Sequence, residues 1–457
     1  MTESGLVEGV SLLDGWLPFT VQVVAFVVLA LAIGKRSGRW SLRWLIAGAV
    51  IGAVVAAATH WYVGHHALAG KAAPFLLWVW IVLSVIAVVV LIAGWPAAGL
   101  PQRVLSILAL PMCLLCILMT VNIWTGYLPT VSSAWDRRPG GGDEIDLTAL
   151  RTMQEEGARP TTGTVVAVDI PDDASGFKHR REYVYLPPSW FASNPPPALP
   201  AVMMIGGEFG DPRDWLSVGA KEALDDFAAS HDGNAPVVVF VDHSGAFLND
   251  TECVNGKRGN AADHLMKDVV PYVTSNFGVS ADPRRWGIVG WSAGGTCAVT
   301  LSVKHPDVFG AFVDIDGQAS PNAGTRQQTI QRLYGGNEEA WASFDPATVM
   351  AAHGRYQGLS AWFGVSEPTT AIHRPGTGGV PGAVDVPVPD PSDPGNVTGT
   401  AQYMCALTSS YGIPCSVVPG PGDHDFTASA AMLPTALPWL AAALGTPDVP
   451  AVALPDA

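Results

Sequence analysis

The sequence predicts two parts of different class: an all-α region of four transmembrane helices, and after it an α/β domain whose mostly parallel sheet has helices on both faces. Two observations lead to this prediction. Nearly all of the apolar excess lies before residue 125, in four long stretches without Asp, Glu, Lys or Arg. Further along the chain, short β-branched runs alternate with longer helical patterns, which is typical of a parallel sheet with crossover helices.

The composition supports a membrane part and argues against one class of partner. Of the 457 residues, 49% are hydrophobic and only 14% are charged, whereas a typical soluble protein has about 25% charged residues. The formal net charge is −15. Because an acidic surface repels the phosphate backbone, we expect no nucleic-acid partner.

The four apolar stretches have the length of membrane helices. They cover about residues 16–34, 44–63, 74–94 and 104–124, and each is close to the ~20 residues that cross ~30 Å of hydrocarbon. Tryptophans lie near their ends, as in an aromatic belt. A cleaved signal peptide is the alternative for the first stretch, but acidic rather than basic residues precede it.

The basic residues of the loops predict the orientation. The second loop contains only Lys71 and the third contains Arg103, whereas the first loop is richest in positive charge, with Lys35, Arg36, Arg39 and Arg43. Positive loops stay in the cytoplasm. We therefore expect a multi-pass protein of the cell (plasma) membrane, with the N-terminus and everything after the fourth helix on the extracytoplasmic side.

The chain after the membrane region divides by composition. Residues 126–160 include three consecutive glycines and lose apolar periodicity, so we expect a linker there. Residues 161–446 are long enough for one α/β domain, and residues 447–457 form a C-terminal tail. The segment 373–400 is rich in Pro, Gly and Asp and is expected to be a flap on the substrate side or a mobile insertion.

The pattern of the α/β domain predicts eight strands and five helices. The first two strands have no helix between them, which predicts an antiparallel hairpin. The expected strands are 164–170, 182–186, 201–205, 237–241, 286–289, 311–315, 360–365 and 415–418. The expected helices are 212–230, 261–276, 293–305, 400–411 and 427–444.

A nucleophilic serine is predicted at the end of one of these strands. Gly290-Trp291-Ser292-Ala293-Gly294 is a G-x-S-x-G sequence between a buried strand and a helical pattern. A G-x-S-x-G sequence that lies between a strand and a helix forms the sharp turn called a nucleophile elbow. The turn is crowded, so its flanking positions must be small, and Ser292 would lie at the positive end of the helix dipole.

A serine nucleophile needs a base, an orienting acid and two donors for the oxyanion. We expect His424, in a loop between the last strand and the last helix, to be the base. The acid should follow a strand between serine and histidine; Glu367 is the first choice and Asp316 the alternative. The donors are expected to be the backbone N–H groups of Ala293 and Glu208, the latter in a glycine-rich loop after the third strand.

Cysteines can form disulfides, and closely spaced cysteines or histidines can bind a metal. Cys405 and Cys415 flank one helix-to-strand turn and are expected to pair, which leaves Cys253 for Cys297; other pairings and free thiols stay open. The closely spaced Cys113 and Cys116 are interpreted as small apolar residues of a membrane helix. The histidines His60, His65 and His66 have no acidic or cysteine partner nearby, so no metal site is expected.

The residues from Thr164 to Leu444 resemble the esterase D and feruloyl-esterase group of α/β hydrolases, which includes the actinobacterial mycolyltransferases. The specific parts of the resemblance are residues 206–215, 288–295, 305–310 and 422–424. It implies an α/β-hydrolase fold, and it supports Glu208 as oxyanion donor and Glu367 as acid. The chain departs from the group at Gly206, where a histidine or aspartate is usual, and in its four-helix anchor.

These observations predict a membrane-anchored, extracytoplasmic serine esterase that acts through an acyl-enzyme on ester-linked lipids or acylated envelope substrates. A cell-envelope acyltransferase, similar to a mycolyltransferase, is one alternative, and a catalytically inactive, membrane-bound binding module is another. The expected partners are an ester, acyl-lipid or glycan substrate and the lipid bilayer. No cofactor or metal is expected, and the sequence does not predict an oligomeric state.

Overall fold

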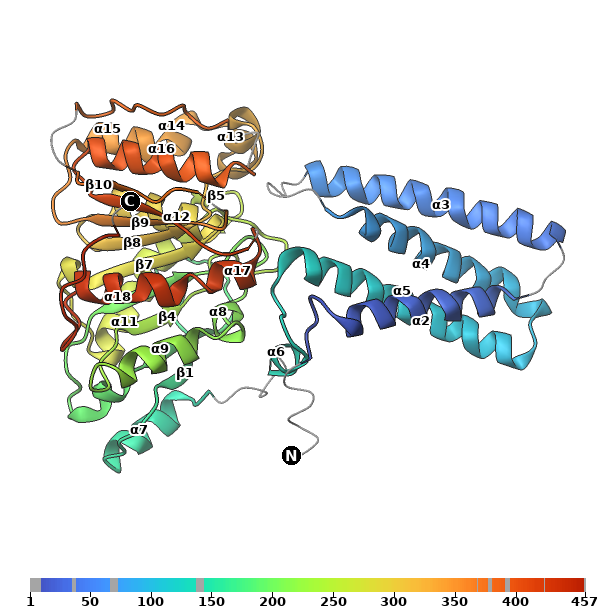
Figure 1. The fold of residues 1–457 in the computed structure, drawn as a ribbon, viewed down its shortest axis with the longest axis horizontal. Helices are drawn as coiled ribbons and strands as arrows, with labels where there is room; N and C mark the ends of the chain where they lie inside the picture. Colours follow the sequence, from blue (N-terminus) through green and yellow to red (C-terminus); the bar gives the residue numbers. More distant parts are fainter. Residues whose placement is uncertain are drawn as a thin grey trace. The chain divides into compact units, whose positions relative to one another are not determined.

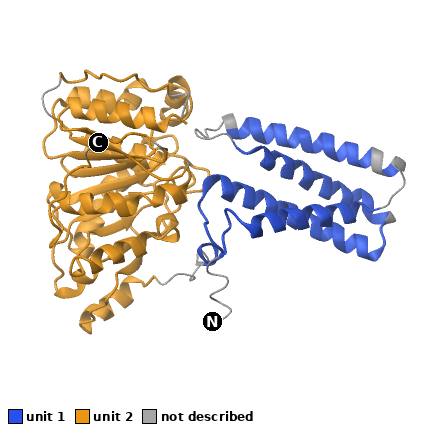
Figure 2. Cartoon of the chain, viewed as in Figure 1, with its two compact units in different colours: residues 1–138 blue, residues 139–457 orange. Residues whose placement is uncertain are grey.

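The computed structural model describes residues 10–34, 38–65, 73–136, 144–367, 369–376, 380–390, 395–422 and 424–455. The chain divides into two compact units, residues 1–138 and 139–457, shown in two colours in Figure 2. The division lies inside the expected linker. Each unit has its own core and is described by itself.

The first unit contains four long helices, each of them long and apolar enough to cross a membrane (Figure 1). Their observed ends lie within a few residues of the expected ones, apart from an earlier start of α3. They are α2 (Trp16–Ile33), α3 (Gly38–His65), α4 (Phe75–Gly94) and α5 (Leu100–Thr125), with the short η1 (Trp95–Ala97) between the last two. Helix α5 ends where Gly126 adopts a left-handed conformation (φ 73°), which terminates a helix at little cost.

Small residues predominate at the centre of this helical unit, together with Leu29, Trp80 and Val90, and large apolar residues cover its outside. Ala25, Ala87, Cys113 and Cys116 are fully buried, and both cysteines are free thiols, as the interpretation of the C-x-x-C pair required. Outward-facing side chains such as Phe19 are largely exposed (70%). Such an inverted distribution suits a lipid environment, where small residues allow helices to approach closely. His60 packs edge-on against Trp78, while the side chains of His65 and His66 lie outside the described residues.

The expected linker from 126 to 160 contains two short helices and one bridge to the sheet. It contains α6 (Val131–Asp136) and α7 (Leu147–Glu155). Asp146 caps α7 by accepting a hydrogen bond from the N–H of Ala149 (2.7 Å), and Ile145 forms a bridge to Val166 in the first strand. These contacts were missed because capping and one isolated bridge give almost no signal in the sequence.

A nine-stranded sheet forms the second unit, in the order β1-β2-β4-β3-β7-β8-β9-β11-β10. The pairs β1–β2, β2–β4 and β10–β11 are antiparallel and the others are parallel, so the predicted mostly parallel sheet and its opening hairpin are confirmed. The strands are β1 (Thr164–Val168), β2 (Glu182–Leu186), β3 (Ala201–Ile205), β4 (Val237–Phe240), β7 (Trp286–Trp291), β8 (Ala311–Ile315), β9 (Ser360–Val365), β10 (Ile372–Arg374) and β11 (Cys415–Pro419).

Helices cover the sheet, and the buried strands read as apolar runs because both of their faces are covered. Helix α12 packs on β3, β7 and β8, helix α16 on β9 and β11, and helix α18 on α9 and β8 (Figure 1). The longer helices are α9 (Ala220–Ala229), α11 (Val270–Phe277), α12 (Ala293–Lys304), α13 (Arg326–Tyr334), α15 (Pro346–His353), α16 (Val397–Ser410) and α18 (Leu433–Ala443).

Short elements complete the second unit, and several of them were not expected. The sequence pattern did not predict helices α13, α14 and α15. It also did not predict β10, a strand at the start of the expected flap. The short elements are η2 (Pro188–Ala192), α8 (Asp214–Ser217), β5 (Asn255–Gly256), β6 (Gly259–Asn260), α10 (Ala261–Asp263), η3 (His264–Val269), η4 (Pro283–Arg285), α14 (Glu338–Ala342) and α17 (Phe426–Ala430).

Two disulfides link elements of the second unit. Cys405 of α16 is bonded to Cys415 of β11, and Cys253, in the segment between β4 and β5, is bonded to Cys297 of α12. Both pairs are those preferred from the sequence. The second bond ties the nucleophile-bearing helix to the long connection after β4, and so limits how far these two segments can separate.

Candidate active site

The expected nucleophile lies in a sharp turn between β7 and α12. Ser292 has a positive φ of 55°, which is rare for a residue with a side chain. Its N–H donates to the carbonyl of Ile315 (2.8 Å), and its own carbonyl accepts from the N–H of Thr296 (3.0 Å). These two bonds hold the strained turn between the neighbouring strand β8 and the first turn of α12.

Three glycines make this turn possible. A side chain at Gly290 would overlap the backbone of Gly294, and one at Gly294 would overlap the backbone of β3 and Gly206. A side chain at Gly295 would overlap the carboxyl group of Asp314 on β8. The small residues of the motif are therefore required by close backbone approach, as the sequence argument expected.

His424 contacts Ser292 from the loop between β11 and α17. Its Nε2 lies 3.1 Å from Ser292 Oγ, although 132 residues separate the two in the chain. The ring packs against Trp291 (5.4 Å between centroids), which in turn packs against Phe426 (5.0 Å). The residue before the serine thus forms one wall for the histidine, a role that the motif alone did not predict.

The carboxylate beside His424 is Asp316, the alternative acid. Its Oδ2 lies 3.4 Å from His424 Nδ1, and its side chain is fully buried. Ser366 donates to it through both N–H (2.8 Å to Oδ1) and hydroxyl, and Ser429 donates from 3.3 Å. With a proton on Nδ1 facing this carboxylate, Nε2 becomes the acceptor for the serine hydroxyl.

Glu367, the preferred acid, does not reach the histidine, and the structure corrects this choice. Among the described residues Glu367 forms no ion pair with His424; it is exposed and accepts a hydrogen bond from Thr398 (2.8 Å). The reason is the direction of the chain at the end of β9. Ser366, one residue earlier, turns toward Asp316, so Glu367 points to the first turn of α16 instead.

The loop after β3 lies directly against the serine turn. Neither the N–H of Ala293 nor that of Glu208 donates to a protein acceptor within the described part of the chain, so both are available to a ligand. Burial raises the pKa of the Glu208 carboxyl well above its usual range, and the nearby Asp250 and Glu252 raise it further. The raised pKa favours the neutral carboxyl form, which would keep negative charge away from a developing oxyanion.

Arg180 fixes this loop, and sequence reasoning missed it. Its guanidinium donates to the carbonyl of Gly210 (2.6 Å) and pairs with Asp242 (2.7 Å) and Asp211 (3.2 Å). Burial raises the pKa of Asp242, but hydrogen bonds from Arg180 outweigh this and leave it below its usual value. No motif marks Arg180, because its partners come from two segments that lie far from it in the sequence.

A buried ionic network lies next to the Arg180 contacts. It includes the described residues whose arrangement most resembles a metal site. The ligand atoms of His179, Glu182 and His264 lie within 4.8 Å of one another. However, both ring nitrogens of His179 face backbone carbonyls, and those of His264 face the carboxylates of Glu182 and Asp268. Glu182 also accepts from the N–H of Asp242 (2.9 Å). These nitrogens serve a structural network that supports the Arg180 contact.

The geometry places a serine hydroxyl beside a histidine ring at the end of a strand in an α/β sheet. Residues 178–377 match the model of a family described as "Putative esterase". An uncharacterized protein of Corynebacterium glutamicum is 36% identical over 223 residues, or 47% of this chain and 52% of that protein. The chain thus spans about half the length of this curated relative.

Comparison with solved structures matches part of the chain to hydrolases and to a mycobacterial protein. A ferulic acid esterase is 17% identical, covering 62% of this chain and 99% of its own (TM-score 0.44). An S-formylglutathione hydrolase from Agrobacterium tumefaciens is 15% identical, covering 62% and 95% (TM-score 0.43). MPT51 of Mycobacterium tuberculosis is 19% identical, covering 61% and 97% (TM-score 0.40). The match to the esterase family model lies within the second unit and covers less than half of the chain, so it marks a similarity of this part to esterases.

A second buried carboxyl group near the candidate site belongs to Asp314. It lies on β8 between Gly295 of the nucleophile helix and Gly317, whose N–H donates to it (2.8 Å). Burial raises its pKa from 3.8 to about 8, and the charge of Asp316 contributes. Asp314 is therefore protonated in the folded protein at neutral pH.

We predict that Asp314→Asn changes how stability depends on pH. In the unfolded chain this carboxyl loses its proton near pH 4, and in the folded chain only near pH 8. Wild-type stability therefore falls between these values, by at most about 1.4 kcal/mol per pH unit from this group. The uncharged variant lacks this loss, so its urea midpoint relative to wild type should rise from pH 4 to pH 8.

The matched control is Asp307→Asn, which removes the same charge from an exposed position. The difference between its urea midpoint and that of the wild type should stay constant from pH 4 to pH 8. A constant difference in urea midpoint for Asp314→Asn as well would show that Asp314 is ionised in the folded protein.

Proposed function

We propose that this chain is a membrane-anchored serine esterase that cleaves ester-linked lipids or acylated envelope components outside the cytoplasmic membrane. One observation carries the proposal. His424 lies 3.1 Å from the hydroxyl of a strained serine at a helix N-terminus and 3.4 Å from a buried carboxylate. This is the arrangement in which a serine becomes a nucleophile.

In the proposed reaction, Ser292 Oγ attacks the ester carbonyl carbon while its proton passes to His424 Nε2. The buried Asp316 stabilises the imidazolium that forms. The N–H groups of Ala293 and Glu208 donate to the oxyanion, and the N-terminal end of α12 adds a favourable dipole. The C–O bond to the alcohol then breaks, and the departing oxygen takes the proton from His424.

The acyl-enzyme is resolved by the reverse sequence with a second nucleophile. His424 removes a proton from water, the hydroxide attacks the Ser292 ester, and the carboxylic acid leaves as the serine regains its proton. An alcohol in place of water would give a new ester, which is the acyltransferase alternative. The same residues serve both outcomes, so the choice depends on which acceptor occupies the site.

We predict that Ser292→Ala abolishes both covalent labelling by a fluorophosphonate and hydrolysis of p-nitrophenyl acetate. Loss of the nucleophile should lower kcat by about four to six orders of magnitude. The measurement uses the full chain purified in detergent, with Ser302→Ala, a buried serine on the far part of α12, as the matched control. Equal labelling of wild type and Ser292→Ala would contradict the proposal. Release of p-nitrophenol that accelerates with added alcohol would indicate the acyltransferase outcome.

The choice between the two carboxylates gives a separate prediction. Asp316→Asn should lower kcat by about 10³- to 10⁴-fold, because the neutral amide neither orients nor stabilises the imidazolium. Glu367→Gln should change kcat by less than about threefold, since Glu367 contacts Thr398 rather than His424. The reverse order of the two effects would restore Glu367 as the acid.

Two features support an extracytoplasmic catalytic unit. The first loop carries most of the positive charge of the membrane region, and the second unit holds two disulfides, which are rare in the reducing cytosol. We predict that an alkaline phosphatase reporter, which needs an oxidising compartment, is active when fused after Leu444. The same reporter fused in the first loop after Arg39 should be inactive. Activity in the opposite pattern would reverse the orientation.

A further inference from the structure

The segment between β4 and β5 contains two consecutive residues in a strained backbone conformation. Glu252 and Cys253 both have a φ of 51°, a left-handed value that residues with a side chain rarely adopt. Such a conformation persists only where the surrounding structure holds it in place. The contacts of these two residues therefore indicate what the segment does for the candidate site.

Buried carboxyl groups give this segment a second reason to move if it were free. Asp250 and Glu252 are both buried, and Oε2 of Glu252 has no hydrogen-bond partner among the described residues. Burial raises the pKa of Asp250 to about 6, and burial together with the charge of Asp250 raises the pKa of Glu252 well above its usual range. Arg258 pairs with Asp250 (3.3 Å) and offsets these shifts only in part. Because such burial is costly, the segment needs a strong restraint.

A disulfide provides this restraint. Cys253 is bonded to Cys297, which lies in the second turn of α12, five residues after Ser292. The two cysteines are 44 residues apart in the chain, and both are fully buried. The bond therefore attaches one of the strained residues directly to the helix that begins with the N–H of Ala293.

The same segment supports the loop that carries Glu208. Thr251 donates its hydroxyl to the carbonyl of His243 (2.5 Å), and the N–H of Cys253 donates to Thr251 Oγ1 (3.1 Å). The ring of His243 lies directly against Gly210, since a side chain at Gly210 would meet this ring at 3.3 Å. The segment thus connects the nucleophile helix to the loop of the second expected oxyanion donor.

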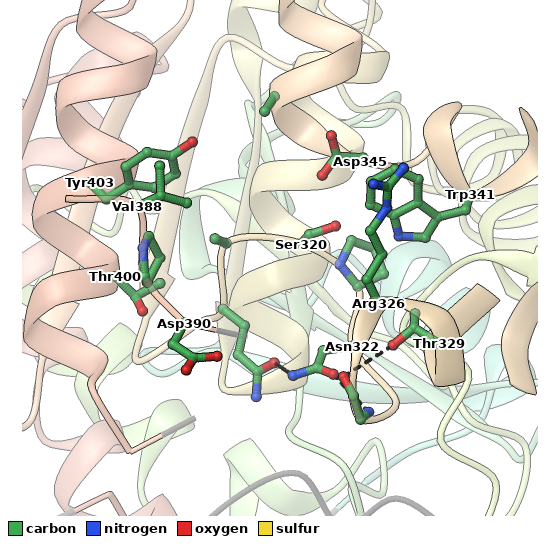
Figure 3. A pocket seen from close by; sticks show the side chains of 16 residues that line it. Ser320, Asn322, Arg326, Thr329, Trp341, Asp345, Val388, Asp390, Thr400 and Tyr403 are labelled. Carbon is green, nitrogen blue, oxygen red and sulfur yellow. Dashed lines mark hydrogen bonds between the residues drawn. The ribbon is translucent and has the colours of Figure 1, made fainter. Parts of the chain in front are cut away.

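A third contact of the segment reaches the loop after β8. The N–H of Asn322 donates to the carboxyl group of Glu252. Asn322 also donates from its side chain to Gln318 (2.5 Å), and it lines a cavity of about 290 Å³ (Figure 3). Because this loop begins after Asp316, the segment contacts elements that carry the nucleophile, the acid and the oxyanion donor.

We propose that the Cys253–Cys297 disulfide positions the oxyanion hole, because it holds the N–H groups of Ala293 and Glu208 at a fixed separation. Without the bond, the strained backbone relaxes and the support of the loop after β3 is lost. The turn at Ser292 keeps its own hydrogen bonds, so a substrate still binds, but its oxyanion loses one donor. The inference rests on the proposed function and adds a condition for its activity.

That condition is oxidation of the two cysteines. Their thiols transfer two protons and two electrons to an external disulfide, which is released as two thiols. An oxidising compartment outside the cytoplasmic membrane favours this exchange. Because both sulfurs are buried in the folded unit, small reductants do not reach the bond once it has formed. The catalytic unit therefore becomes active on oxidative folding and then stays active.

The first test compares two double variants of the full chain in detergent. Cys253→Ala/Cys297→Ala should lower kcat for p-nitrophenyl acetate about 10- to 100-fold and change KM less than about threefold, as expected when a transition-state contact is lost. Cys405→Ala/Cys415→Ala removes the other disulfide of the same unit and should change kcat less than about threefold. Urea midpoints verify that each variant is folded during the assay. Equal losses of kcat in both variants, or unchanged kcat in the first, overturn the proposal.

A single substitution tests the same support with the disulfide intact. Thr251→Val removes the hydroxyl that donates to the carbonyl of His243. It should lower kcat about three- to tenfold and leave KM unchanged, so the proposal stays testable if the first double variant does not fold. An unchanged kcat would contradict it.

Hydrogen exchange measures the loop after β3 directly and needs no catalysis. In Cys253→Ala/Cys297→Ala, the amides of residues 206–211 should exchange at least about tenfold faster than in the wild type, while Cys405→Ala/Cys415→Ala should exchange at the wild-type rate. Unchanged exchange in the first variant would overturn the positioning role, even where esterase activity is present. Faster exchange in this variant, without fluorophosphonate labelling of the wild type, would reject the esterase and keep the positioning of the loop.

Discussion

The strained turn at Ser292 is the constraint on which the rest of the site depends. A residue with φ of 55° is kept in this conformation only because its N–H is bonded to β8 and because Gly290, Gly294 and Gly295 let the backbones meet. That close approach also brings the loop after β3 and the buried Asp314 against the start of α12. The nucleophile, the free N–H donors and the acid-bearing strand are thus placed by one packing arrangement.

Asp316 lies one strand nearer to Ser292 than Glu367 does, and this position of the orienting carboxylate is compatible with the packing around the turn. Asp316 follows β8, which is adjacent to the nucleophile strand β7, whereas Glu367 follows β9, one position farther away. Asp316 also has a positive φ of 53°, and its carboxylate is held by Ser366 and Ser429. In the proposed site, Ser366 at the end of β9 holds the carboxylate of Asp316, while the neighbouring Glu367 contacts Thr398.

The sequence was informative where one local pattern determines the structure. Apolar length placed the four long helices, β-branched runs placed the main strands, and the small residues around Ser292 marked the turn. The choice of Asp316 over Glu367 depends on the direction of one side chain at a strand end, which no pattern encodes. Arg180 and helices α13 to α15 were missed for a related reason: their contacts join distant segments, and these helices are short.

The central claim is that Ser292, His424 and Asp316 act as one unit with the N–H groups of Ala293 and Glu208. A crystal structure of the full chain after reaction with a fluorophosphonate tests this most directly. We predict phosphorus bonded to Ser292 Oγ, its oxygen within hydrogen-bond distance of both N–H groups, and His424 still paired with Asp316. An adduct on another residue, or a His424 ring turned to Glu367, would contradict it.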